Sequence, residues 1–267
     1  MEMRDTAELV AALRGAGSVF AEEELAELQR AADESDVIEA IEMYVERRTL
    51  GEPIEHIVGS ARFAELRIVV HPGVFVPRRR TELVATIVAD RLREVADAAT
   101  GRPRLLDFGC GTGAIAALAA HRVPGIDIVA VDAESNAVAC ARVNLPGALV
   151  VQASALDALD DHGASEPFDV VAANLPYVPT AELALMPHEA RDFEPLIALD
   201  GGTDGLDPLH EHAWAIGARL RTGGIAVTEV APHQVETATA MLEQAGFVSV
   251  VVRTDEASGA TALVATR

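Results

Sequence analysis

The segment Asn174–Leu175–Pro176–Tyr177 places an amide, a backbone carbonyl and an aromatic ring together at the end of an apolar run, residues 170–173. The Asn174 side-chain oxygen and the Leu175 carbonyl can each accept one hydrogen from a planar NH₂ group. Such contacts orient the nitrogen and stabilise the positive charge that grows on it during alkylation. Pro176 would stiffen the turn, and Tyr177 would wall a flat substrate group. An ordinary β-turn is the competing interpretation, because Asn and Pro both favour turns.

A second candidate site lies in LLDFGCGTGA, residues 105–114, where glycines separate an apolar run from a helical pattern. Glycines at such a junction let the backbone turn sharply and let a nucleotide-like ligand approach the N-terminus of the following helix. The residues that we expect around this ligand are Asp107, Gly109, Cys110, Gly111, Thr112 and Gly113. A turn that binds nothing is disfavoured, because the acidic Asp132 ends the next apolar run.

Two cofactors compete for this loop. Its spacing nearly fits the dinucleotide fingerprint G-x-G-x-x-G/A, and Asp132 could hold the ribose diol of either cofactor. The loop is also similar to the D-x-G-x-G-x-G loop of S-adenosylmethionine-dependent methyltransferases, with Asp107 before the turn. Hydride transfer has no need of an Asn-x-Pro-Tyr segment, whereas methyl transfer to an NH₂ group does. We therefore expect S-adenosylmethionine as cofactor, with Asn174 next to both cofactor and substrate.

Both segments need a common framework, and the chain after residue 101 supplies one. Apolar runs alternate there with helical patterns, which predicts an α/β fold with a parallel or mostly parallel sheet and helices on both faces. The expected strands are 104–109, 127–132, 148–154, 168–174, 223–230 and 247–254, and the expected helices follow residue 113 or span 135–144 and 234–246. Ligands of such sheets bind outside the carboxyl ends of the strands. The Gly-rich loop and Asn174 should therefore share one edge of the sheet.

The first part of the chain has a different pattern. Helical spacing of apolar residues predicts helices in 6–17, 21–32 and 35–51. In residues 61–77, short apolar runs flank His-Pro-Gly and suggest a β-hairpin. A longer helix is expected from Thr81, with Thr81 as its N-cap. We place the domain boundary near residues 75–85.

Composition excludes several classes of protein. Half of the 267 residues are hydrophobic, no apolar run reaches the ~20 residues of a membrane-spanning helix, and the first residues are too charged for a secretory signal. A cytoplasmic protein is therefore expected. The formal charge of −21 disfavours a nucleic-acid partner. Cys110 and Cys140 lack metal-ligand spacing, so we expect reduced thiols and no metal site.

Over nearly its whole length the chain resembles the protein-glutamine methyltransferases of peptide-chain release factors, the HemK/PrmC family. GEPIEHIVGSARF and VFVPRRRTE are similar to the linker region of that family, LLDFGCGTGAIA to its cofactor loop and NLPYVP to its Asn-Pro-Pro-Tyr segment. TEVAPHQ is similar to the segment of that family in which a strand is followed by a Gln. The most specific match is EARDFEPLIALDGGTDGLD, residues 189–207, because neither a turn nor a general nucleotide-binding fold requires it.

The resemblance implies two domains. Residues 1–75 would be a helical substrate-recognition domain with a hairpin linker, and residues 76–267 a Rossmann-like, seven-stranded S-adenosylmethionine-dependent methyltransferase domain. Residues 109–113 and Asp132 would hold the cofactor, with Ser154 and Ala155 also in the cofactor site. Residues 174–177 would hold the glutamine of a Gly-Gly-Gln segment. The expected partner is a release factor, without direct contact with nucleic acid or membrane, and a monomer is the favoured state.

Departures from the family pattern keep alternatives open. Leu175 replaces the first Pro of the Asn-Pro-Pro-Tyr segment, Ser154 stands where an Asp usually faces the adenine, Arg-Arg replaces Pro-Asp in residues 77–82, and the tail lacks G-x-D-R. The spelling Asn-Leu-Pro-Tyr also occurs in enzymes that dimethylate adenines of ribosomal RNA, although these have a basic surface. A scaffold that binds cofactor and translation factor without methylation is the other alternative.

Five further positions carry minor expectations. His188, His210 and His212 are expected to be solvated rather than metal-bound, and Trp214 is expected in the core. Glu82 is either a group that orients the pocket or an ordinary first-turn helix acid.

Overall fold

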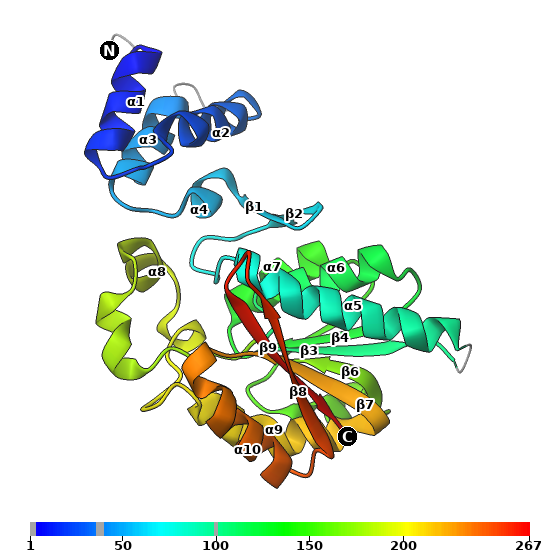
Figure 1. Cartoon of the computed structure of the whole chain (residues 1–267). Helices are drawn as coiled ribbons and strands as arrows, with labels where there is room; N and C mark the ends of the chain where they lie inside the picture. The colour runs from blue at the N-terminus through cyan, green and yellow to red at the C-terminus, as the bar shows by residue number, and fades with distance from the viewer. Residues whose placement is uncertain (1–3, 36–39, 99–100) are drawn as a thin grey trace.

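The N-terminal helices pack around an apolar interior of their own, apart from the sheet (Figure 1). The computed structural model describes residues 4–35, 40–98 and 101–267. The four helices are α1 (Thr6–Gly15), α2 (Ala21–Asp33), α3 (Ala40–Thr49) and α4 (Ile54–Val58). Leu9, Leu25 and Val45 are buried where α1, α2 and α3 meet. The first two predicted helices are confirmed. The third is confirmed from residue 40 onward, and residues 36–39 lie outside the described ones.

A two-stranded hairpin follows, but its turn is not where the sequence placed it. Strands β1 (Ser60–Phe63) and β2 (Leu66–Val69) pair antiparallel, so the turn falls at Ala64 and Glu65. The predicted turn at His-Pro-Gly was wrong, because those residues form a separate turn after β2, in which the Val74 N–H bonds the His71 carbonyl at 3.1 Å. Ala64 has a φ of 49°. The Ala64 N–H donates to Glu82 at 3.0 Å, so this first-turn acid of α5 also holds the hairpin.

A seven-stranded sheet forms the centre of the rest of the chain and confirms the predicted α/β class. Its strands are β3 (Arg104–Phe108), β4 (Asp127–Asp132), β5 (Leu149–Gln152), β6 (Phe168–Ala172), β7 (Leu220–Glu229), β8 (Ser249–Asp255) and β9 (Ala260–Thr266). They are ordered β5-β4-β3-β6-β7-β9-β8, and β9 runs opposite to the other six strands of this sheet. The sequence did not predict β9.

Helices cover both faces of this sheet (Figure 1). One face carries α5 (Glu82–Asp97), α6 (Ala114–Arg122) and α7 (Ser135–Asn144), and the other carries α9 (Asp207–Arg219) and α10 (Val235–Gln244). Side chains alternate between the two layers, so Leu105 joins the first core and Leu106 the second. Between β6 and β7 lie the short helix α8 (His188–Phe193) and the 3₁₀ turns η3 (Thr180–Leu185) and η4 (Leu196–Ala198). Further 3₁₀ turns are η1 (Arg79–Thr81), η2 (Leu156–His162) and η5 (Pro232–Gln234).

One single-residue expectation was wrong, and a second was confirmed in position but not in its contact. Trp214 is 72% exposed, because it lies on the outer side of α9. Thr81 is the N-cap of α5, as predicted, but its side chain makes no capping hydrogen bond, since its hydroxyl bonds Glu229 instead. Within the described residues, no helix is both long and apolar enough to span a membrane.

Candidate active site

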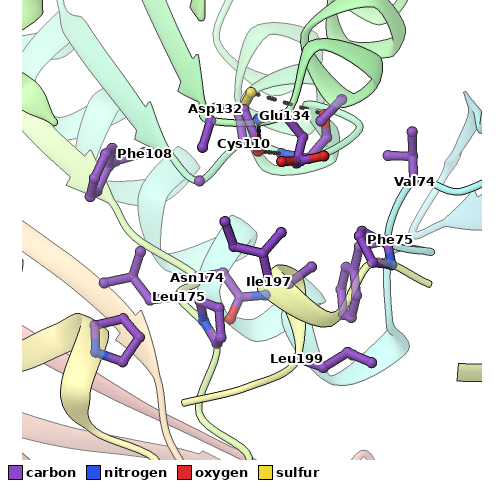
Figure 2. A pocket seen from close by; sticks show the side chains of 18 of the residues that line it. Val74, Phe75, Phe108, Cys110, Asp132, Glu134, Asn174, Leu175, Ile197 and Leu199 are labelled. Carbon is purple, nitrogen blue, oxygen red and sulfur yellow. Dashed lines mark hydrogen bonds between the residues drawn. The ribbon is translucent and has the colours of Figure 1, made fainter. Parts of the chain in front are cut away.

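A pocket of about 700 Å³ opens at the carboxyl ends of β3, β4 and β6. In Figure 2, Asp132 and Cys110 lie on one side of it, and Asn174 and Ile197 on the other. All but two of the predicted site residues line this pocket, the exceptions being Asp107 and Gly113. The predicted residues that do line it are Gly109, Cys110, Gly111, Thr112, Asp132, Ser154, Ala155, Asn174, Leu175, Pro176 and Tyr177. Asp107, in β3, accepts from the N–H of Ala116 in α6, and Gly113, the N-cap of α6, packs against Leu145.

The Gly-rich loop is fixed by its own backbone. Gly109 and Cys110 both donate their N–H groups to the Val131 carbonyl, at 2.9 and 3.0 Å, so the loop is tied to the end of β4. Gly109, Gly111 and Gly113 have φ values of 69°, 53° and 78°, which L side chains rarely adopt. A Cβ on Gly113 would lie 2.8 Å from Leu145, whereas a Cβ on Gly111 would meet nothing within 4 Å. Gly113 is therefore needed for packing, and Gly111 leaves open space at the pocket.

Two acidic side chains, Asp132 and Asp107, accept hydrogen bonds from the backbone of this loop and of the segments next to it. Asp132 accepts from the Gly111 N–H at 2.8 Å and from the Glu134 N–H at 3.0 Å, and burial raises its pKa. Asp107 is 1% exposed and accepts from the Ala116 N–H at the start of α6. Its other oxygen has no hydrogen-bond partner among the described residues. Burial, opposed by the Ala116 hydrogen bond, raises the pKa of Asp107 to about 7.

The Asn174–Tyr177 segment forms the facing wall. Asn174 follows β6, and its side-chain oxygen is buried without a hydrogen-bond partner within the described part of the chain. The Leu175 side chain is only 7% exposed and faces Gly109, so it fills space between the two loops. Gln234 donates to the Tyr177 carbonyl at 2.9 Å and to the Asp204 carbonyl at 3.0 Å. The segment is therefore held on both sides.

A buried carboxylate lies behind this wall, and the sequence analysis did not single it out. Glu229, 3% exposed, ends β7 and accepts from the Tyr177 hydroxyl at 2.7 Å and from the Thr81 hydroxyl at 2.8 Å. It also forms an ion pair with Arg80 at 2.9 Å. Burial raises the pKa of Tyr177, so its hydroxyl keeps its proton. The available signal was an acid at a strand end in TEV, as at Asp132.

A further acid ties the linker to the segment between α8 and η4. Glu194 is 6% exposed and pairs with Arg78 at 2.6 Å, and burial raises its pKa to about 7. Next to it, Leu196 and Ile197 remain 61% and 55% exposed at the pocket. These residues lie in the specific stretch 189–207, but nothing in the residue types alone assigned them to the pocket.

The other predicted positions differ in how exposed their side chains are. Ser154 and Ala155 are exposed at the pocket after β5. His188 is exposed and pairs with Asp192, and His210 is exposed. His212, however, is partly buried in the pocket wall with its ring edge-to-face on Phe108, at 4.9 Å between centroids. No group of three potential metal ligands occurs in the described ranges. Both cysteines are free thiols.

Comparison with known proteins decides the family. A release factor glutamine methyltransferase of Geobacter sulfurreducens is 37% identical over 207 residues, which are 76% of this chain and 69% of that protein. This chain belongs to the release factor glutamine methyltransferase family. The family profile of the methyltransferase small domain also matches residues 65–187.

Solved structures agree with the fold of this methyltransferase family member. A methyltransferase from Pyrococcus furiosus is 16% identical with a TM-score of 0.53, and the match covers 76% of this chain and 89% of that one. The 16S rRNA N2 G1207 methyltransferase of T. thermophilus, solved with AdoMet and guanosine, is 20% identical with a TM-score of 0.53, over 78% of this chain and 49% of that one. At these identities the likeness concerns the fold alone.

Proposed function

We propose that this protein transfers a methyl group from S-adenosylmethionine to the side-chain amide nitrogen of a glutamine in a protein, the Gly-Gly-Gln glutamine of a peptide-chain release factor. One observation carries the proposal: the buried Asn174 oxygen has no hydrogen-bond donor among the described residues, and it lies in a pocket whose other wall is the Gly-rich loop. A buried acceptor without a donor costs about 1–3 kcal/mol. The N–H of a bound amide would supply that donor.

The residues of the pocket fit the cofactor. The open space at Gly111 admits a ligand against the loop backbone, and Asp132 lies at the end of β4 with acceptor oxygens for a ribose diol. Ser154 and Ala155 border the same side of the pocket after β5. S-adenosylmethionine, when bound, supplies an electrophilic methyl group.

The protein's own groups would then work on the substrate nitrogen. An amide nitrogen is a poor nucleophile, because its lone pair is delocalised. The Asn174 oxygen and the Leu175 carbonyl would each accept one of its N–H hydrogens, which aims the nitrogen and stabilises the positive charge that develops there. Tyr177 would wall the flat amide. Leu175 in place of Pro leaves the backbone carbonyl available for this role.

The partner and the setting follow from the same proposal. We assign residues 1–75 to substrate recognition and residues 76–267 to methyl transfer, as a monomer acting in the cytoplasm, where release factors work. The apolar side chains around the pocket, including Leu196 and Ile197, suit a protein loop. The charge of −21 argues against RNA as the substrate.

Intact-mass measurement tests this function. Candidate release factors, and the same factors with Gln replaced in Gly-Gly-Gln, are incubated with the protein and S-adenosylmethionine. A mass gain of one methyl group that requires the glutamine supports the proposal. Methylation of ribosomal RNA alone would favour the adenine alternative. Cofactor binding without any transfer would favour the scaffold.

A further inference from the structure

Glu229 is the centre of a small buried network behind the Asn174 wall. One of its carboxylate oxygens accepts from the Tyr177 hydroxyl and forms an ion pair with Arg80. The other accepts from the Thr81 hydroxyl at 2.8 Å. Thr81 is 5% exposed and Glu229 is 3% exposed, so water does not compete freely for these contacts.

The direction of the Thr81 hydrogen bond is fixed by chemistry. A carboxylate can only accept, so the single hydroxyl proton of Thr81 is committed to Glu229. The same hydroxyl oxygen lies 3.4 Å from the Asn174 side-chain nitrogen. Toward Asn174, Thr81 can therefore act only as an acceptor.

This directionality selects one of two orientations of the Asn174 amide. With the NH₂ group toward Thr81, a donor meets an acceptor. With the oxygen toward Thr81, two acceptors would face one another, and the NH₂ group would occupy the place where the substrate N–H must be received. The observed orientation, with the oxygen free of any described partner, is the one that suits an N–H substrate.

Arg80 supports the same assignment of donors and acceptors around Glu229. A guanidinium only donates, so the Glu229 oxygen that it contacts must stay an acceptor. The Arg80 guanidinium also lies 5.5 Å from the centre of the Tyr177 ring. Arg80 is one of the two arginines that replace Pro-Asp in this chain. The hydrogen-bond network around Glu229 therefore includes a residue at which the chain departs from the family pattern.

We propose that Thr81 and Glu229 are positioning residues that fix the Asn174 amide with its oxygen available to the substrate. This inference rests on the proposed function, because it assigns the two residues to the same transfer step. Glu229 is not among the residues that line the pocket, and Thr81 lines it with its hydroxyl proton committed to Glu229. We assign the effect of Thr81 to the orientation of Asn174, whereas Glu229 also holds the Tyr177 hydroxyl.

A double-mutant cycle separates this role from a general structural one. Single-turnover methylation is measured for the parent, Thr81→Val, Asn174→Ala and the double variant, with S-adenosylhomocysteine affinity as a check on the cofactor site. Thr81→Val should slow transfer by about tenfold, the effect of roughly one hydrogen bond. In the Asn174→Ala background the same change should have almost no further effect, because no amide remains to be oriented. Equal losses in both backgrounds would overturn the proposal.

Further variants sharpen the test. Thr81→Ser keeps the hydroxyl and should recover most of the rate lost in Thr81→Val, and Thr261→Val makes the same change at a buried threonine of β9 outside the network. Glu229→Gln tests the direction of the network. The Arg80 guanidinium only donates and so favours the Gln oxygen on its own side, which leaves the Gln NH₂ to donate to Thr81. Thr81 must then donate to Asn174, and the amide flips. We expect transfer to fall by about 10²-fold with unchanged cofactor binding. A Glu229→Gln variant as active as the parent would contradict the proposal.

The amide itself can be observed without any substrate. The side-chain NH₂ resonance of Asn174, assigned by its loss in Asn174→Asp, should shift and exchange faster with solvent in Thr81→Val but not in Thr261→Val. An unmoved resonance in Thr81→Val would overturn the positioning role whether or not the protein methylates a release factor. A moved resonance in a protein that transfers no methyl group would support the positioning role and reject the proposed function.

Discussion

The Asn174 oxygen is the atom on which the proposed chemistry depends most directly. Asn174→Ala removes one of two acceptors directed at charge that develops only during transfer, while the Gly-rich loop stays intact. We expect a loss of about 10²–10³ in single-turnover rate, with nearly unchanged affinity for S-adenosylhomocysteine. Rapid-quench intact-mass kinetics on a Gly-Gly-Gln protein checks this. A variant that transfers at the parent rate would make Asn174 only a turn residue.

Leu175 contributes its carbonyl to the proposed chemistry and its side chain to packing against Gly109. Leu175→Pro keeps the carbonyl and supplies the residue that the family pattern prefers. We expect turnover to remain within about tenfold of the parent. Steady-state methylation of the release factor is the measurement. Complete loss of turnover would assign the leucine side chain itself to the shape of the pocket.

Asp107 should make stability depend on pH. Burial raises its pKa from 3.8 to about 7 in the folded protein, so the folded state holds a proton that the unfolded state has released. Its contribution to the free energy of unfolding therefore falls as pH rises between these two values. Asp107→Asn cannot ionise and should lack this fall. Urea unfolding of both proteins at about pH 4 and about pH 8 measures the difference, and parallel pH profiles would rule the effect out.

At the scale of elements, two glycines of the β3–α6 loop have different roles: Gly113 is needed for packing, and Gly111 borders the binding pocket. Gly113→Ala combines a positive φ with a contact against Leu145, so we expect about 2–4 kcal/mol less stability. Gly111→Ala has a positive φ but no contact, so about 1–2 kcal/mol should be lost. Its new methyl group would instead occupy pocket space and weaken S-adenosylhomocysteine binding more than Gly113→Ala does. Chemical denaturation and calorimetry give the two measurements. Equal effects of both variants on ligand binding would contradict this division.

Elements with strong local patterns were predictable from the sequence. The apolar runs of β3, β4 and β6 and the glycines between β3 and α6 carry enough signal to place the cofactor loop and Asn174 at one sheet edge. The tail was not recognised as a strand, because three of the seven residues of ATALVAT are alanines, which strands disfavour, and none is aromatic. The hairpin turn was misplaced because Ala64 adopts a positive φ where no glycine or asparagine indicates one. Its N–H donates to Glu82, a contact that local sequence does not reveal.

Contacts between distant segments could not be predicted in the same way. The hydroxyl of Thr81 bonds a carboxylate 148 positions later rather than the helix that it precedes. Arg78 and Glu194 pair across 116 positions. Such partners depend on the completed fold, and no local spacing encodes them.

At the scale of the whole molecule, the N-terminal helices present an apolar projection. Val19 and Phe20, between α1 and α2, are 84% and 66% exposed. If these helices grip the release factor, Phe20→Ser should raise KM for the full-length factor by about tenfold and leave kcat unchanged. Ser is a preferred N-cap, so the change at the N-cap of α2 should not weaken the helix. Steady-state kinetics checks this, with Val248→Ser, 78% exposed before β8, as control. Equal KM values for both variants would remove Phe20 from the interface.

The strand order β7-β9-β8 also constrains how the sheet is completed. Strand β8 is made before β9, yet it reaches the sheet only by pairing with β9, so it has no place at the edge of β7 while β9 is absent. Strand β9 must therefore dock on β7 before β8 or together with it, and until it does, β7 has an open edge. An open edge can pair with the equivalent segment of another copy. If β9 and β8 dock slowly on β7, newly made chains are exposed to strand exchange and aggregation. In the finished sheet, β9 covers that edge.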